Sequence, residues 1–140
     1  MQSISKVAVW GNTNNTIFPD LRNASIDGIS AVKILEKSWI YGEYHARVQN
    51  RSNDIVKLRV FGAAASYSSA VIDHMRDWLY GSNEWHSMGI KSDKYRGIIP
   101  EGLVFSMPVT TANGKYSVVE GISFDDEQAN LKLTKTIEEL

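Results

Sequence analysis

The histidines are the first candidates for proton transfer or metal binding in this sequence. His45, His74 and His86 are its three histidines, and a neutral imidazole can act as a general base or bind a metal. His74 is flanked by acidic residues, and Asp77, three residues further on, could pair with it on a helix. A solvated or packing role for His74 is the alternative that its polar surroundings favour. His45 and His86 have no second ligand at the spacing of a metal site, so no metal is predicted.

Carboxylates and small residues are the next candidates. Asp125-Asp126-Glu127 and Glu138-Glu139 could do acid–base work, but both fall near predicted helix ends, where the helix dipole explains such clusters. The small residues at 62–66 permit close approach of a ligand or of a packed helix. The sequence has no Cys, which excludes a disulfide scaffold, a thiolate metal site and a Cys nucleophile. Taken alone, these residues do not identify a reaction.

Length and composition predict a single globular domain over residues 1–140. The chain is 43% hydrophobic and 22% charged, and its net charge of −1 argues against binding to nucleic acid or to anionic membranes. No apolar run approaches the ~20 residues of a membrane span, and the N-terminus lacks a signal peptide's apolar stretch, so a cytoplasmic protein is expected. The G-x-G-x-x-G fingerprint of dinucleotide-binding domains is missing, so no cofactor is predicted for this chain.

The first half of the chain predicts short strands followed by helices. Residues 7–10 are β-prone, residues 17–21 form a turn or edge segment, and residues 23–28 form a connection or hairpin tip. Apolar residues at helical spacing follow from residue 30 to residue 48. A second helical stretch covers 52–60, with Ser52 as its N-cap.

The second half predicts one strong helix, a sheet and a closing helix. The helix covers 66–80, with Val71, Met75, Trp78 and Leu79 on its apolar face and Gly81 as its C-cap. The hydrophobic period then becomes two, and Asn113-Gly114 is a hairpin signal. Residues 125–140 predict an amphipathic helix. The whole pattern favours an α+β fold, with antiparallel strands packed on long helices.

Several motifs in a fixed order carry a resemblance to a known family. Residues 7–12 read Val-Ala-Val-Trp-Gly-Asn, and Phe18-Pro19-Asp20 follows. This pair resembles the opening of the C-terminal, substrate-binding half of cytosolic-type malate dehydrogenases, which read V-x-x-W-G-N-H and then Y-P-D. Further motifs recur in the family's order and at similar spacing, among them Val48-Gln49-Asn50-Arg51, Asp73-His74-Met75-Arg76-Asp77, Ser87-Met88-Gly89, Phe105-Ser106-Met107-Pro108 and Val119-Glu120-Gly121. The related parasite lactate dehydrogenases look similar too, and the two branches stay open.

The resemblance implies the lactate/malate dehydrogenase C-terminal fold and, in a complete enzyme, NAD-linked hydride exchange between malate and oxaloacetate. In that chemistry a neutral His held by an Asp takes the hydroxyl proton, and arginines clamp the two carboxylates. The family places that Asp and those arginines upstream of the segment that opens this sequence. It also implies subunit contacts through the helices at 39–59 and 66–80. A homodimer or other oligomer is therefore expected, with malate or oxaloacetate as the small-molecule partner.

By resemblance, Asn12, Thr13 and Ala63 occupy substrate-binding positions, but two of them depart from the family. Family members carry the catalytic His directly after W-G-N, where this sequence has Thr13. A threonine hydroxyl cannot accept that proton near neutral pH. Ala63 aligns with a family Ser that lies beside the substrate. His74 cannot replace the missing base, since the family carries a His in the same motif without using it. No catalytic residue is therefore predicted.

Two functional hypotheses follow. In the first, the chain is the substrate-binding and dimerisation half of a malate dehydrogenase-like oxidoreductase, separated from its NAD domain and inactive alone. In the second, it is a non-catalytic pseudoenzyme that acts as a protein–protein interaction module.

Overall fold

The strands of this protein pair in antiparallel ladders. The structure, a computed structural model, describes residues 3–13, 15–59, 62–92 and 99–140. The largest sheet has the order β6–β7–β8 and consists of β6 (Ser82–Lys91), β7 (Val104–Ala112) and β8 (Lys115–Val118). A second ladder pairs β2 (Ala8–Trp10) with β3 (Phe18–Asp20). A third, small sheet has the order β1–β4–β5 and joins β1 (Ile4–Ser5), β4 (Ser25–Ile26) and β5 (Ile29–Ser30).

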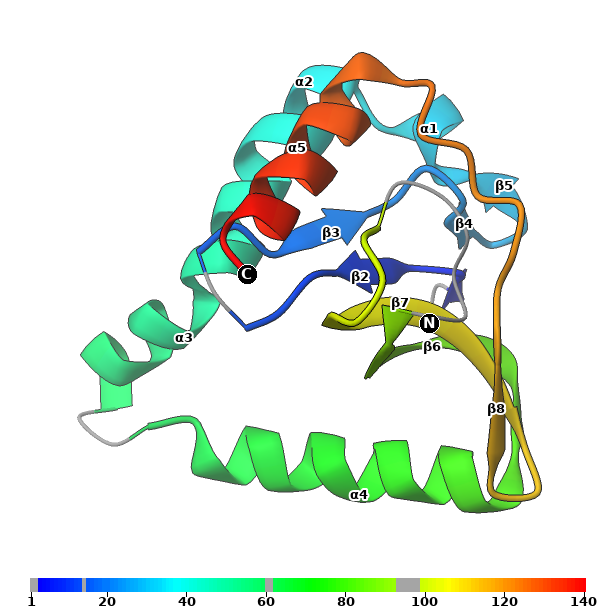
Figure 1. Cartoon of the computed structure of the whole chain (residues 1–140). Helices are drawn as coiled ribbons and strands as arrows, with labels where there is room; N and C mark the ends of the chain where they lie inside the picture. Colours follow the sequence, from blue (N-terminus) through cyan, green and yellow to red (C-terminus); the bar gives the residue numbers. More distant parts are fainter. Residues whose placement is uncertain (1–2, 14, 60–61, 93–98) are drawn as a thin grey trace.

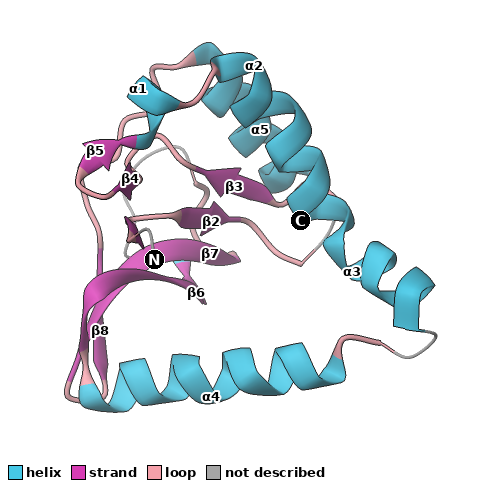
Figure 2. Ribbon diagram, turned by 180° about the vertical axis from the view of Figure 1, so that it is seen from behind, coloured by secondary structure: helices cyan, strands magenta, loops and turns pink. Residues whose placement is uncertain are grey.

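The helices lie on two sides of these strands (Figure 1). A helical run consists of α1 (Ala31–Ile34), α2 (Lys37–Trp39), the π-helical turn η1 (Ile40–Tyr44) and α3 (His45–Arg59). It is followed by α4 (Ala64–Tyr80) and, after the sheet, by α5 (Glu127–Glu138). Figure 2 shows the strands between α4 on one side and α5 with α2 on the other. The antiparallel strands and long helices confirm the predicted α+β fold.

The main core lies between the β6–β7–β8 sheet, the β2–β3 ladder and α5. Its buried side chains include Trp10, Phe18, Met88, Phe105, Met107, Val109, Ala129 and Leu133. On α5 the buried positions are Ala129, Leu133 and Thr136, which recur at helical spacing. Asp126 caps α5 by accepting the Ala129 N–H at 3.1 Å. The predicted closing amphipathic helix is therefore confirmed.

The hairpin and strand predictions are confirmed as well. Asn113 and Gly114 both have positive φ, 51° and 72°, and connect strands in which Ala112 pairs with Lys115. These are the values that a tight two-residue hairpin turn requires. Residues 17–21 contain β3, which pairs with β2 and places Pro19 opposite Val9.

The predicted helix start at Ser52 is wrong. The helix α3 begins at His45 and runs to Arg59 without a break, so Ser52 lies in its interior. The Ser52 hydroxyl does not cap a helix but hydrogen-bonds to the Tyr67 hydroxyl at 2.9 Å. Residue 60, the last of the predicted stretch, lies outside the described residues.

The helix predicted at 66–80 is confirmed, and most of its apolar face is exposed within this chain. It begins at Ala64, and its Val71, Met75 and Leu79 side chains are 61%, 40% and 54% exposed. Trp78 packs against the main core. Two hydrogen bonds hold this end of α4, because Thr111 Oγ1 donates to the Asp77 carbonyl at 2.7 Å and the Gly114 N–H donates to the Trp78 carbonyl at 3.1 Å. The sheet anchors α4 at its C-terminal end.

His45 is a buried titratable group of this fold. Its side chain is 1% exposed and lies among the rings of Phe18, Tyr41 and Tyr44. Neither ring nitrogen has a hydrogen-bond partner of good geometry. Burial, and then the positive charge of Lys132, lower the pKa of His45 to about 4. The backbone of Pro19 and the charge of Asp20, both on β3, raise this pKa only in part. The imidazole is therefore neutral in the folded protein at neutral pH.

We expect His45 to make the fold less stable as the pH falls from about 6.5 to about 4. In that window the unfolded chain protonates His45 and the folded chain does not, so the free energy of unfolding decreases as the pH decreases. The size of this contribution is on the order of 3 kcal/mol over the whole window, of which about 2 kcal/mol is lost between pH 7 and pH 5. Urea unfolding of the wild type and of His45→Phe at pH 7 and pH 5 measures it. An identical pH dependence in the two proteins would contradict the assignment.

Candidate functional site

A buried ion pair fixes the end of β3. Asp20 is 3% exposed, and its carboxylate accepts hydrogen bonds from Arg22 Nε at 2.9 Å and from Arg22 Nη2 at 2.7 Å. Burial alone would lower the pKa of Arg22, but the hydrogen bonds and charge of Asp20 outweigh it and raise that pKa. Trp10 Nε1 also donates to Asp20, at 3.1 Å. The Trp of one sequence motif and the Asp of the next are therefore bonded to each other.

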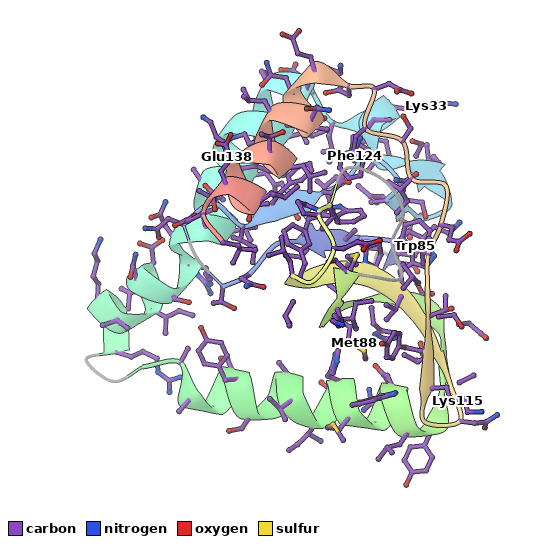
Figure 3. The ribbon with its side chains drawn as sticks, viewed as in Figure 1. Lys33, Trp85, Met88, Lys115, Phe124 and Glu138 are labelled. Atoms are coloured by element: carbon purple, nitrogen blue, oxygen red, sulfur yellow. The ribbon has the colours of Figure 1, made fainter. Side chains whose placement is uncertain are left out.

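Arg22 extends this connection to the segment before α5. Its guanidinium lies 4.4 Å from the ring centroid of Phe124, which Figure 3 labels, and Nη1 donates to the Ser123 carbonyl at 2.6 Å. The Phe124 ring also meets Trp10 edge-on, with centroids 5.1 Å apart. Cation–π and edge-to-face contacts of this kind orient the groups they join. The ends of β2 and β3 are thereby attached to the segment before α5.

The end of β2 is bound tightly to the large sheet. The backbones of Gly11 and Ser106 exchange hydrogen bonds, with N–H to carbonyl distances of 3.3 and 3.0 Å. Val9 donates its N–H to Ser87 Oγ and accepts from Ser106 Oγ, each at 2.8 Å. Gly11 has φ +94°, and a Cβ atom there would overlap Thr136 Oγ1 on α5. Only glycine fits this position without displacing α5.

A pocket of about 430 Å³ opens where β2 ends. Its lining residues are Gly11, Asn12, Thr13, Ile17, Gly89 and Ser106. None of these six carries a charged side chain. Their hydroxyl and amide groups can donate and accept hydrogen bonds, but none of them can take a proton as a general base near neutral pH. The pocket presents neutral hydrogen-bonding groups, and its own lining offers no acid–base chemistry.

The loop that carries Thr13 is held from two sides. Gln49 Nε2 on α3 donates to the Ile17 carbonyl at 2.9 Å. The Thr16 hydroxyl donates to the Glu139 carboxylate at the end of α5. Figures 1 and 2 both show the C-terminal end of the chain beside the β2–β3 connection. Elements far apart in sequence therefore position the pocket.

The structure brings together two of the three predicted site residues. Asn12 and Thr13 both line the pocket. In the amide orientation that suits its surroundings, Asn12 Nδ2 donates to the Gly11 and Val104 carbonyls, each at 3.2 Å, so this group also holds the loop. Ala63 is buried at the start of α4 and is not among the pocket's lining residues.

Four pocket residues were not predicted as site residues from the sequence: Gly11, Ile17, Gly89 and Ser106. Gly89 and Ser106 belong to Ser87-Met88-Gly89 and Phe105-Ser106-Met107-Pro108, two motifs that carry the family resemblance. Those motifs were the available signal. Nothing in the sequence alone shows that they meet Thr13.

The remaining histidines do not form a site with Asp77. The Asp77 carboxylate accepts from Arg76 Nε at 3.2 Å and lies 3.9 Å from His86 Nδ1. The His74 ring meets the His86 ring edge-on, with centroids 6.5 Å apart. Over the ranges that the structure describes, no group of three potential ligands could hold a metal ion. The packing alternative for His74 agrees with this arrangement.

A second, smaller cavity of about 210 Å³ uses its polar groups to hold the fold. Its lining residues are Arg22, Val32, Lys37, Ile40, Tyr41 and Asp126. Lys37 Nζ lies 2.7 Å from Asp126, and Tyr41 Oη donates to the same carboxylate at 3.0 Å. The hydrogen bond from Lys37 contributes most to lowering the pKa of Asp126, to about 2. These groups join α2 and η1 to the N-terminus of α5.

The family model for the lactate/malate dehydrogenase alpha/beta C-terminal domain matches residues 1–140. The chain belongs to the lactate/malate dehydrogenase family. Its similarity to solved structures agrees with this assignment.

Malate dehydrogenase from Naegleria fowleri is 40% identical, with a TM-score of 0.88 over 98% of this chain and 42% of that one. Lactate dehydrogenase from Trichomonas vaginalis, in complex with NADH and oxamate, is 30% identical, with a TM-score of 0.88 over 98% and 44% of the two chains. Malate dehydrogenase from Aeropyrum pernix, at 20% identity and a TM-score of 0.67, shares the fold. The chain thus spans less than half the length of these relatives.

The described residues do not fit a dinucleotide such as NAD. Its usual cradle is a glycine-rich turn between a parallel strand and a helix N-terminus. Here the described strand pairs are all antiparallel, and the glycine before α4 follows a helix. None of the described helices has the length and apolarity needed to cross a membrane.

We expect Arg22→Met to lower the free energy of unfolding by about 3 kcal/mol, because it leaves the buried Asp20 carboxylate without its cation. Arg76→Met is the matched control. Arg76 pairs with Asp73 and Asp77 on the exposed face of α4, so its loss should change stability by less than about 0.5 kcal/mol. Urea unfolding of the three proteins tests both values. Equal effects of the two substitutions would show that the buried pair has no special role.

Proposed function

We propose that this chain is the substrate-binding and self-associating half of a malate dehydrogenase-like oxidoreductase, and that it does not turn over substrate alone. The reaction of the intact system would be NAD-linked exchange between malate and oxaloacetate. The higher identity to the Naegleria fowleri malate dehydrogenase than to the Trichomonas vaginalis lactate dehydrogenase supports the malate branch. The resemblance to cytosolic-type enzymes supports a cytoplasmic location.

The observation that carries this proposal is Thr13 in the pocket at the end of β2. The resemblance puts the family's proton acceptor at this position, and a neutral hydroxyl is too weak a base to take a proton at pH 7. A dicarboxylate also calls for cations, and none of the pocket's lining side chains is charged. The chain therefore retains a binding surface without the groups that drive the reaction.

Within the complete reaction, this chain's residues would orient the substrate. Asn12 holds the loop through the Gly11 and Val104 carbonyls, and Thr13 offers one hydroxyl to the substrate side. NAD would supply the hydride acceptor when bound to a separate unit. The arginines that clamp the carboxylates would come from that unit as well, whereas the family's base belongs at position 13 and Thr13 does not replace it.

Calorimetric titration with oxaloacetate tests the proposal. We expect weak, measurable binding that Thr13→Val reduces several-fold, because the valine keeps the shape of the side chain and removes its hydroxyl. Thr110→Val, at an exposed position on β7 outside this pocket, is the matched control and should bind like the wild type. Malate oxidation with NAD by the purified chain, at a rate abolished by Thr13→Ala, would overturn the proposed inactivity.

A second function, a protein–protein interaction module, is favoured by the surface of α4. Val71, Ile72, Met75 and Leu79 lie within about a third of the helix circumference and are all exposed. Contiguous apolar patches of this kind mark interaction sites. Val56 and Leu58 on α3 are exposed as well. If oxaloacetate does not bind at all, this second function becomes the better account of the chain.

Both functions include self-association through α3 and α4, which correspond to the helices at 39–59 and 66–80 where the family resemblance implies subunit contacts. We expect analytical ultracentrifugation at micromolar concentration to show a dimer or larger species. Met75→Glu places a charge within the apolar stripe and should shift the protein to monomer. Leu131→Glu, at an apolar position on α5 that is 48% exposed, is the control and should leave the oligomer intact. A monodisperse wild-type monomer would contradict self-association.

A further inference from the structure

The tip of the β7–β8 hairpin carries the only Asn-Gly pair in the sequence. Asn113 and Gly114 are exposed at the turn, and the adjoining Lys115, labelled in Figure 3, marks the hairpin tip beside α4. An Asn side chain can be attacked by the backbone nitrogen of the next residue. Glycine in that next position removes the steric hindrance that a side chain would offer. Among the Asn residues of this sequence, Asn113 is therefore the one most open to this attack.

The nucleophile of that reaction, the Gly114 backbone nitrogen, is held in a hydrogen bond in the folded protein. The Gly114 N–H donates to the Trp78 carbonyl in the last turn of α4, at 3.1 Å. The nitrogen must lose this proton before it can attack. The turn's positive φ values at both residues also hold the backbone in one conformation. Cyclisation therefore requires the hairpin tip to separate from α4.

That separation depends on few contacts. None of the α4 side chains is fully buried. Next to the Gly114 hydrogen bond, Thr111 Oγ1 donates a second one to the Asp77 carbonyl, at 2.7 Å. Trp78 is the side chain of this turn that packs on the main core. Elements held in this way open locally more often than the whole protein unfolds. Removal of the Thr111 hydroxyl should therefore make the hairpin tip open more often.

We propose that Asn113 is a site of spontaneous deamidation whose rate is set by the docking of α4 on the hairpin. After water or hydroxide removes its proton, Gly114 N attacks Asn113 Cγ and forms a C–N bond, and the side-chain amide nitrogen leaves as ammonia. Water then opens the resulting succinimide at either carbonyl, which gives aspartate or isoaspartate at position 113. No oxidation or reduction takes place.

The modification would in turn weaken the docking of α4. Isoaspartate adds a methylene to the backbone inside a two-residue turn and adds a negative charge. The turn can then no longer place the Gly114 N–H against the Trp78 carbonyl. The last turn of α4 loses that bond and keeps the contacts of Trp78, of Thr111 and of Asp77 with His86.

Peptide mass spectrometry after incubation at mildly alkaline pH tests the inference. In urea, we expect Asn113 to convert from amide to acid roughly tenfold faster than in the folded protein, because unfolding frees the Gly114 nitrogen. In the folded state, Thr111→Val should accelerate this conversion several-fold, whereas Thr110→Val, which alters an exposed hydroxyl next to it, should not. In urea the three proteins should react at one rate. Asn83, followed by Glu84, is an internal control that should convert more slowly throughout.

Three outcomes would overturn the inference. Equal rates at Asn113 in the folded and unfolded protein would remove the protection by α4. Equal folded-state deamidation rates in Thr111→Val and Thr110→Val would show that the Thr111 hydrogen bond does not control the reaction. Failure of Asn113 to convert in urea would exclude it as a deamidation site. Hydrogen exchange at the Gly114 amide, which Thr111→Val should speed up, measures the opening independently of the covalent step.

Discussion

The buried pair of Asp20 and Arg22 is the interaction on which the candidate site depends. A buried ion pair stabilises a fold only where further hydrogen bonds satisfy its remaining donors and acceptors, since both charges lose their hydration. Here Trp10 donates to Asp20, and the Ser123 carbonyl accepts from Arg22. The pair therefore connects β2, β3 and the start of α5 at one point. The surface pair of Arg47 and Glu43 on the helical run connects only neighbouring turns.

The residues around this pair match the family's motifs, whereas Thr13 in the same segment departs from them. Trp10, Gly11 and Asp20 match the family's motifs, and all three have structural roles. Trp10 donates a hydrogen bond to Asp20, and Gly11 leaves the space that Thr136 on α5 occupies. Thr13, the departure in the same segment, lies in the pocket and makes no contribution to that framework comparable to Gly11. The framework that holds the pocket therefore does not depend on which side chain stands at position 13. This is why fold similarity at a TM-score of 0.88 does not by itself carry the relatives' activity over to this chain.

Local chemistry made parts of this fold predictable from sequence. The Asn113-Gly114 turn, the Gly81 cap and the amphipathic pattern of α5 each act within a few residues, and all three predictions are confirmed. The start of α3 was missed because the weak capping preference of Ser52 competes with an unbroken helical stretch from His45. Arg22 could not be assigned from sequence, because its contacts with Ser123 and Phe124 span about a hundred residues. The pocket has the same difficulty, since β2, β6 and β7 each contribute to it, and only the family resemblance pointed to Asn12 and Thr13.

The behaviour of α4 follows from how little of it is buried. Most helices in proteins depend on packing for their stability, because isolated helices of this length are marginal in water. The contacts of α4 with the sheet are concentrated at its last turn, around Trp78, Thr111 and Gly114. The exposed stripe along the rest of the helix stabilises nothing until another surface covers it. A partner that binds this stripe stabilises the helix by mass action. Docking of the hairpin tip and binding of a partner are then linked, because each is favoured when α4 is fully formed.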